Sequence, residues 1–431
     1  MPQHRHSPFA VLDVLANTSF RFLWFAQICS QLALNMMIFI LALSVYERTG
    51  SNAAVSGLFL SYGIPSLLFG MIAGVIVDHV DRRSVLIVCD LSRAVLVALL
   101  FFFVHNVPMV YLFVFVHALI NQLYVPSEAS TIPRIVPKSQ LLTANSVFSF
   151  TYYSSMAVGF ILAGPILRLL SLQSTLGVLG ISFLSASFFV SRLPSQGEGL
   201  RSLHRILRAD FRSIFSRVIT DVREGIVYVS SSPILSDALI LLTGTQVIIA
   251  ILGTLGPGFA HEVLKVDIRD ASVYIIGPTV VGIISGALWV GSTGYRISKS
   301  SLIRTGIVGA GIVLILISIS VRLAHTEVLP EFFRRSTVLF IELVLFFLLG
   351  VANSFLDVPA NSILQSEARG SMRGRIYGML AAAVGGIGVL PVIIGGVLAD
   401  VIGVGKVILL LGVVVLAYGA YRIRYNKRII V

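Results

Sequence analysis

Long apolar runs separated by short polar segments repeat along the whole chain. A membrane-spanning helix needs about 20 largely apolar residues, because only a helix satisfies its own backbone hydrogen bonds in lipid. None of the runs shows the alternation of apolar and polar positions that a membrane β-barrel requires. The pattern therefore predicts an all-α membrane protein with twelve membrane-spanning helices, at residues 21–46, 54–77, 84–104, 108–130, 144–170, 173–193, 233–257, 270–291, 300–321, 336–358, 375–399 and 403–421.

The composition places the chain in the membrane class. Of its 431 residues, 56% are hydrophobic and 12% are charged, whereas about 25% of a soluble domain is charged. The mean hydropathy is +0.93. The first apolar run has the length of a full span rather than the short core of a cleavable signal peptide, so we expect the first helix to direct its own insertion.

The basic residues predict the orientation of the chain in the membrane. If the N-terminus is cytoplasmic, 23 of the 32 Lys and Arg residues fall in cytoplasmic segments and 8 fall on the opposite side, while Arg93 lies within a span. Such an excess follows the positive-inside rule. We therefore expect a multi-pass protein of the plasma (inner) membrane with cytoplasmic N- and C-termini, and the net charge of +12 needs no nucleic acid partner.

A faint internal repeat divides the chain into two halves. The segment "NQLYVPSEASTI" (121–132) ends the fourth predicted span, and "NSFLDVPANSIL" (353–364) ends the tenth. Six spans followed by six in the same orientation indicate a parallel repeat about an axis along the membrane normal. The predicted domains are an N-terminal six-helix bundle at 1–193, a cytoplasmic linker at 194–232 and a C-terminal six-helix bundle at 233–431.

The predicted linker contains a basic amphipathic segment, "LRSLHRILRADFRSIFSRVI" (200–219). Its apolar residues recur at helical spacing with arginines between them. This pattern predicts a helix on the inner membrane face that binds lipid through apolar burial and charge. A regulatory or partner-binding role is the alternative.

The polar bridge after the second span carries a family resemblance. "GVIVDHVDRRSVLI" resembles the loop signature of the major facilitator superfamily, a glycine, an aspartate and a basic pair in register, at Gly74, Asp78, Arg82 and Arg83. Asp81 stands where many members of that family have glycine. Because the helix dipole disfavours an acidic residue at a helix C-terminus, we expect Asp78 to pair with Arg82, Arg83 or Arg93 and to gate the inner face. The alternative is that the basic pair only anchors the topology.

Three further segments refine this resemblance. "IPRIVPKSQLLTANS" (132–146) and "RGRIYGM" (373–379) are similar to the multidrug and macrolide efflux branch. "VGFILAGPILRLL" (158–170) resembles the antiporter signature of that superfamily's fifth span, with Leu167 and Arg168 in place of its last glycines; the matching positions are Gly159, Gly164 and Pro165. The resemblance implies two six-helix bundles that share one central substrate site, with alternating access and proton antiport.

Polar residues form stripes on four of the predicted helices. Within each span they are three or four residues apart, so they share a helix face, and polar groups facing lipid are costly. In the family that the chain resembles, helices 1, 4, 7 and 10 line the central cavity. Tyr152 adds aromatic surface for an amphipathic cargo, or packs. The predicted cavity residues are Gln27, Gln31, Asn35, His117, Asn121, Tyr152, Thr243, Gln246 and Asn353; interhelical hydrogen bonding is the alternative.

Carboxylates within the spans are candidates for proton coupling. Glu342 lies about two turns into the tenth span, where it can exchange a proton or pair with a nearby arginine. Asp237 can couple protons or stabilise the N-terminus of the seventh helix. Asp90 and Arg93 are three residues apart on one helix, so we expect them to form an ion pair.

The chemistry absent from the sequence excludes several classes of protein. There is no GxxxxGK[ST] phosphate loop, and Cys29 and Cys89 have no metal-ligand spacing, so we predict no ATPase, no enzyme, no metal and no cofactor other than the proton gradient. We predict a monomeric exporter of lipophilic small molecules, with membrane lipids and protons as its other partners. An exporter of an endogenous product such as a siderophore, a lysophospholipid flippase, and a non-transporting receptor or scaffold are the alternatives.

Overall fold

The computed structural model describes residues 10–78, 80–195, 227–324, 331–367, 376, 379–380, 383 and 388–425. All regular structure in these residues is helical. The predicted linker segment 200–219 lies outside them, as does most of 373–379. The chain divides into two compact units.

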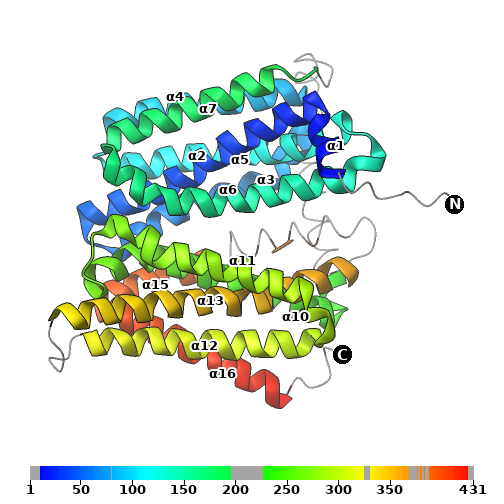
Figure 1. The fold of residues 1–431 in the computed structure, drawn as a ribbon. Coiled ribbons are helices and arrows are strands. Elements are labelled where there is room, and N and C mark those ends of the chain that lie inside the picture. The colour runs from blue at the N-terminus through cyan, green and yellow to red at the C-terminus, as the bar shows by residue number, and fades with distance from the viewer. Residues whose placement is uncertain are drawn as a thin grey trace. The chain divides into compact units, whose positions relative to one another are not determined.

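The first unit comprises residues 1–41 and 64–217. Its helices run side by side, with α4 beside α7 (Figure 1). Its core brings together Phe20, Leu86, Tyr124 and Phe148 from four different helices. The elements are α1 (Ala10–Ala16), α2 (Thr18–Thr49, to residue 41), α3 (Asn52–Asp78, from residue 64), α4 (Arg82–Phe103), α5 (Val107–Ile135), η1 (Lys138–Gln140), α6 (Leu141–Leu169) and α7 (Leu172–Ser191).

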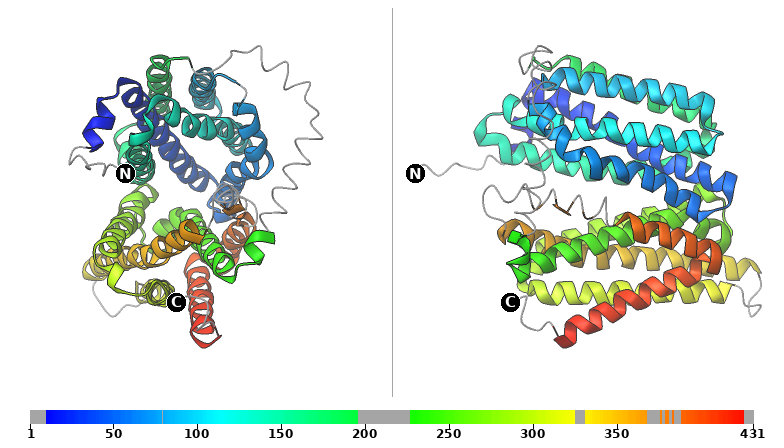
Figure 2. Two further views of the ribbon diagram at one scale, coloured as in Figure 1. Left: turned by 90° about the vertical axis from the view of Figure 1, so that its right-hand side faces the viewer. Right: turned by 180° about the vertical axis from the view of Figure 1, so that it is seen from behind.

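The second unit comprises residues 42–63 and 218–431. It therefore includes the end of α2 and the start of α3. Figure 2 shows the helices of each unit in two further views, the left one looking along them. The remaining elements are α10 (Pro233–Gly258), η3 (Phe259–Val263), η4 (Ile268–Asp270), η5 (Ser272–Ile276), α11 (Gly277–Ser292), η6 (Gly294–Arg296), α12 (Lys299–Ala324), α13 (Glu331–Glu367), α15 (Val389–Ile402) and α16 (Val404–Tyr425).

Local capping explains where several helices begin. The side chain of Asn106 accepts a hydrogen bond from the Met109 backbone at the start of α5, and Ser171 caps α7 in the same way. Asp81 caps α4 by accepting bonds from the backbone and hydroxyl of Ser84 at 3.0 and 2.7 Å. Asp81, which stands where many members of the family that the loop resembles have glycine, therefore caps the start of α4.

Glycines allow close contact between helices in the second unit. A Cβ on Gly282 of α11 would overlap the Phe347 carbonyl oxygen of α13, and one on Gly350 of α13 would overlap the Thr279 carbonyl oxygen of α11. Small residues at such crossings let backbones approach in a membrane protein.

Ten of the described helical segments are long and apolar enough to cross a membrane. They match ten of the twelve predicted spans. The other two predicted spans, 54–77 and 375–399, correspond to α3 and to α15, which is a shorter apolar helix in the described part of the chain. The all-helical membrane class is confirmed, and the full set of twelve spans stays a prediction.

Candidate functional site

The first unit buries a cluster of polar side chains that we call the Arg93 cluster. Its members come from α2, α4 and α5, all of which are membrane-spanning by length and composition. Arg93 is 1% exposed, Asp90 is 0% exposed and Glu128 is 4% exposed. The cluster consists of Ser30, Asp90, Arg93, Asn121, Tyr124 and Glu128.

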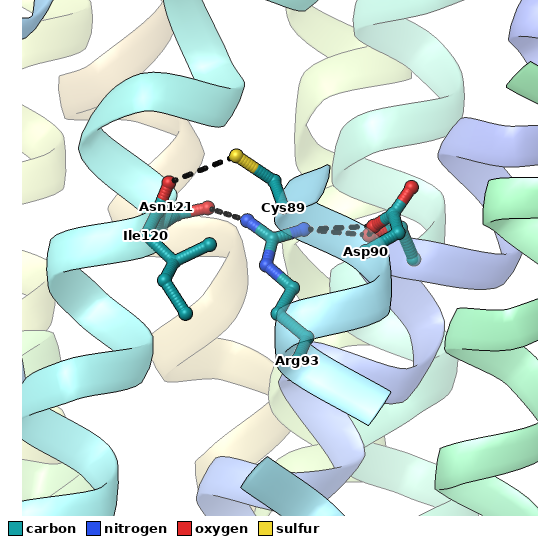
Figure 3. A network of polar contacts seen from close by, with 6 residues as sticks. Cys89, Asp90, Arg93, Ile120 and Asn121 are labelled. Carbon is teal, nitrogen blue, oxygen red and sulfur yellow. Dashed lines mark hydrogen bonds and ion pairs between the residues drawn. The ribbon is translucent and has the colours of Figure 1, made fainter. Parts of the chain in front are cut away.

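Arg93 is the centre of this cluster. Its Nη1 donates to the Ser30 hydroxyl at 2.8 Å and lies 3.3 Å from Asp90 Oδ1. Its Nη2 donates to Asn121 Oδ1 at 2.7 Å, as Figure 3 shows. The Arg93 Cζ lies 4.1 Å from the centre of the Tyr124 ring, a distance suited to a cation–π interaction. The predicted Asp90–Arg93 pair is thus confirmed. Ser30 of α2 and Asn121 of α5 hold the Arg93 guanidinium from the two neighbouring helices.

The second carboxyl group of the cluster belongs to Glu128. The charges of both Asp90 and Arg93 act on Glu128. Within the described part of the chain, Glu128 Oε1, Asp90 Oδ2 and the Tyr124 hydroxyl make no hydrogen bond of normal geometry, although the Tyr124 hydroxyl lies close enough to Glu128 to act on its carboxyl group. Two carboxyl groups therefore share the charge of Arg93, and a buried carboxylate without a compensating cation is costly.

Helical spacing on α5 places the partners of Arg93 along one face. His117, Asn121, Tyr124 and Glu128 follow each other at intervals of four, three and four residues. His117 is buried and packs against the Phe183 ring, and neither of its ring nitrogens has a hydrogen-bond partner among the described residues. The stripe thus extends the polar interior of the unit beyond Arg93.

Three members of the Arg93 cluster were not among the residues predicted from the sequence: Ser30, Tyr124 and Glu128. The predicted fourth span, 108–130, contains Tyr124 and Glu128, but the segment around Pro126 served only as a marker of the repeat; α5 itself continues to Ile135. The available signal was the spacing of Tyr124 and Glu128 from His117 and Asn121, which puts all four on one helix face. That Arg93 of α4 faces this stripe depends on the packing of the two helices.

In the second unit, Asp237 forms a different kind of buried pair. Arg422 donates to its two carboxylate oxygens at 2.6 and 2.7 Å, and the pair joins α10 to α16. Tyr418 lies next to it, with its hydroxyl 3.4 Å from Arg422 Nη1. Such a bidentate contact is the strong form of an arginine–carboxylate interaction.

Glu342 of α13 is buried in the second unit. It accepts a hydrogen bond from the Ser320 hydroxyl of α12, and its other oxygen has no partner among the described residues. Arg334 and Arg335 are the arginines nearest to Glu342 in the sequence, and their side chains lie outside the described residues.

The predicted cavity residues fall into separate environments. Gln27, Gln31, Asn35 and His117 are buried, whereas Asn121, Thr243 and Asn353 are half-buried and Tyr152 and Gln246 are exposed. Gln27 donates to the Phe148 carbonyl oxygen of α6 at 3.2 Å, and Asn35 donates to the Gln31 carbonyl oxygen at 2.7 Å. Of these predicted residues, the structure brings Asn121 into the Arg93 cluster.

The predicted gating arginines bind within the first unit. Arg82 Nε donates to the Ser130 hydroxyl of α5 at 2.7 Å, and Arg83 donates to the Ser191 carbonyl oxygen of α7 at 2.5 Å. Arg93, the third cation proposed to pair with Asp78, binds Asp90. The side chain of Asp78 and the surroundings of Gly74 lie outside the description.

The antiporter-like segment lies in α6. A Cβ on Gly159 would lie 3.0 Å from Asn35 Cβ and 3.2 Å from the Leu32 carbonyl oxygen, so this glycine lets α6 approach α2 closely. Gly164 is buried, and Pro165 lies inside the helix.

No group of three or more side chains suited to a metal ion occurs among the described residues. The polar chemistry that the described residues do offer is that of buried carboxyl groups, an arginine and hydrogen-bonding side chains. Such groups bind and release protons without a cofactor.

Comparisons with known proteins agree with this architecture. Residues 23–328 match the family model described as Major Facilitator Superfamily. Macrolide efflux protein A of Streptococcus pyogenes is 23% identical over 406 residues, which cover 91% of this chain and 92% of that protein. Multidrug efflux pump Tap of Mycolicibacterium fortuitum is 24% identical over 388 residues, covering 87% and 88%. The crystal structure of nucleoside transporter NupG has the same fold, with a TM-score of 0.66 at 15% identity and coverage of 94% of this chain and 98% of that one.

Proposed function

The chain belongs to the major facilitator superfamily, whose members are membrane transporters rather than enzymes, and on that premise we propose that it exports hydrophobic or amphipathic small molecules in exchange for protons. Two relatives that align over most of the chain carry efflux names, one for macrolides and one for multiple drugs. Their names suggest the direction of transport and the class of cargo. The proposed arrangement is twelve spans in two six-helix bundles, with both termini in the cytoplasm and alternating access to one site.

The observation that supports proton exchange is the charge of the Arg93 cluster. With Asp90 and Glu128 both ionised, the cluster carries one negative charge in excess of Arg93. With one of the two protonated, it is neutral. Because uncompensated charge inside a membrane protein is costly, such a site takes up a proton when its surroundings are dry and releases it when water enters.

We assign separate roles to the residues of the cluster. Glu128 is the proton carrier, because it lacks the direct arginine contact that Asp90 has. Arg93 and Asp90 set the charge against which Glu128 exchanges its proton, and Asn121 and Ser30 hold the guanidinium in place. Glu342 of the second unit is a further candidate, because its carboxyl group is buried with only a hydroxyl as partner.

The test is transport driven by an imposed pH gradient in inside-out vesicles, using a panel of fluorescent lipophilic cations and macrolides. We expect the wild type to accumulate one or more of these compounds only when the gradient is present. Glu128→Gln should still bind cargo, but the pH gradient should no longer drive its accumulation. Glu342→Gln tests the carboxyl group of the second unit in the same way. Asp13→Asn is the matched control, because Asp13 is exposed on α1.

Gradient-driven transport by Glu128→Gln at the wild-type level would exclude Glu128 as the carrier. If the vesicles accumulate none of the panel, cargo of another class must be sought. A difference in drug susceptibility with and without expression is the simplest first screen for that cargo.

A further inference from the structure

The turn between α2 and α3 belongs to the second unit, although both helices also contribute to the first. Residues 42–63 form one compact unit with residues 218–431. Gly50, in the left-handed region at a φ of 61°, turns the chain from the end of α2 to the start of α3. A residue with a side chain adopts this conformation at a cost, so glycine suits the tight connection.

One carboxylate binds the start of α3. Asp400, near the end of α15, accepts hydrogen bonds from the Ser51 hydroxyl at 2.5 Å and from the Asn52 side chain at 3.0 Å. It also accepts from the backbone N–H groups of Asn52 and Ala53 at 2.7 and 3.1 Å. Asp400 therefore caps the N-terminus of a helix that lies almost 350 residues earlier in the chain, where free N–H groups and the helix dipole favour a negative charge.

Glycines of two helices leave room for this contact. A Cβ on Gly396 of α15 would overlap the Ser56 hydroxyl and lie 2.7 Å from the Asn52 carbonyl oxygen. A Cβ on Gly258 of α10 would overlap the Asn52 side chain. Ser56 also donates to the Val392 carbonyl oxygen of α15 at 3.1 Å. The start of α3 thus packs directly on the backbones of α10 and α15.

The end of α2 makes further polar contacts with the same unit. The Tyr46 hydroxyl lies 3.1 Å from Glu262 of η3, and Arg269 lies 3.4 Å from Glu47. The Glu47 pair is exposed and contributes little by itself. These contacts bring α2 to the same region as the Asp400 cap.

We propose that Asp400 is a positioning residue that latches the start of α3 onto α15 at the non-cytoplasmic ends of these helices, and that the latch opens and closes during transport. The inference rests on the alternating access of the proposed function but not on its cargo or on proton coupling. Hydrogen bonds from hydroxyl, amide and backbone donors to one exposed carboxylate can be exchanged for water, unlike a dry apolar contact. The hydrogen bonds from Ser51, Asn52 and Ala53 to Asp400 can therefore break together when the start of α3 moves away from α15.

The latch is testable by measuring the distance between spin labels on either side of it. The labels are placed at Thr49→Cys and Val401→Cys, both of which are exposed, in the full chain with Cys29 and Cys89 replaced by Ala and reconstituted in nanodiscs. We expect a short and a long distance in the wild type. Asp400→Asn keeps the size of the side chain and removes its charge and one acceptor, so the ratio of long to short distances should rise about fivefold, the size of effect of losing one helix cap.

A second variant acts on the same contact through packing. Gly396→Ala places a methyl group against Asn52 and Ser56, so it should shift the population to the long distance more strongly than Asp400→Asn. Two controls lie in the same unit. Among the described residues, Asp267 caps only its own turn, at the Arg269 backbone, so Asp267→Asn removes a carboxylate that does not touch α3. Gly256→Ala adds a methyl group that meets no atom of the described residues within 4 Å. Both should leave the distances unchanged.

An unchanged distance distribution in Asp400→Asn and Gly396→Ala, with both proteins monodisperse and folded, overturns the latch. A single short distance in the wild type and in all variants overturns it as well, because the contact is then static. The distance measurement needs neither cargo nor a pH gradient. If the distances shift as expected but transport in vesicles does not depend on the pH gradient, the latch stands and only the proposed proton antiport is contradicted.

Discussion

The two units each bury an aspartate–arginine pair, and the pairs differ in balance. In the second unit, Arg422 binds both oxygens of Asp237 at 2.6 and 2.7 Å. In the first unit, Arg93 reaches a single oxygen of Asp90 at 3.3 Å and shares its charge with Glu128. The balanced pair joins two helices, α10 and α16, whereas the cluster has one carboxyl group more than its cation can satisfy. Under the proposed function, the balanced pair is structural and the unbalanced cluster is the place where a proton is exchanged, because removing one partner of a buried pair leaves an uncompensated charge.

The largest effect is expected from breaking the balanced pair. Arg422→Met leaves Asp237 buried without a cation, which should lower the free energy of unfolding by about 3–5 kcal/mol. Denaturant unfolding in detergent measures this loss. The double variant Asp237→Asn/Arg422→Met, which removes both charges, should recover most of it, and a double variant as unstable as the single one would contradict the pairing.

Removing the hydroxyl that bridges the cluster should have a smaller effect. Ser30 donates to Asp90 at 3.0 Å and accepts from Arg93 at 2.8 Å, so Ser30→Ala leaves both groups with one partner fewer. We expect a loss of about 1–3 kcal/mol in the free energy of unfolding, because buried charged groups lose a hydrogen bond. Ser285→Ala is the control, since among the described residues that hydroxyl binds the Val281 carbonyl oxygen of its own helix and nothing else. Equal losses in the two variants would show that the bridge has no special role.

The smallest effect is expected at Tyr124. Its ring stacks on Arg93, but its hydroxyl, although close to Glu128, makes no hydrogen bond of normal geometry within the described residues. Tyr124→Phe keeps the ring, so the free energy of unfolding should change by less than about 1 kcal/mol. A loss above this limit, measured in the same unfolding series, would reveal a hydrogen bond from this hydroxyl that the cluster needs.

The sequence was sufficient for features that depend on one segment at a time. Apolar length predicted the spans that the structure confirms, and the three-residue spacing predicted the Asp90–Arg93 pair, because both are properties of a single helix. Contacts between helices that are far apart in the sequence could not be predicted from it. Arg422 lies 185 residues from Asp237, and Asp400 reaches across a still longer separation to Ser51.

The physical reason is that spacing defines a helix face but not the neighbour that the face meets. Asp237 was interpreted from its position near a helix start, where the dipole alone accounts for an acidic residue. Its bidentate partner depends on the packing of α10 against α16. Glu128 was missed although the predicted span 108–130 contains it, because its segment was used only as a marker of the internal repeat; its spacing from His117 and Asn121 already placed it on their helix face.

The most direct test of the central claim is proton release on cargo binding. Purified protein in weakly buffered solution, with a pH indicator, receives the panel compound that gives the largest transport signal. We predict that the wild type and Asp237→Asn/Arg422→Met release protons, whereas Glu128→Gln releases none. Release by Glu128→Gln equal to that of the wild type, or loss of release in the Asp237→Asn/Arg422→Met variant alone, would contradict the assignment of proton exchange to the Arg93 cluster.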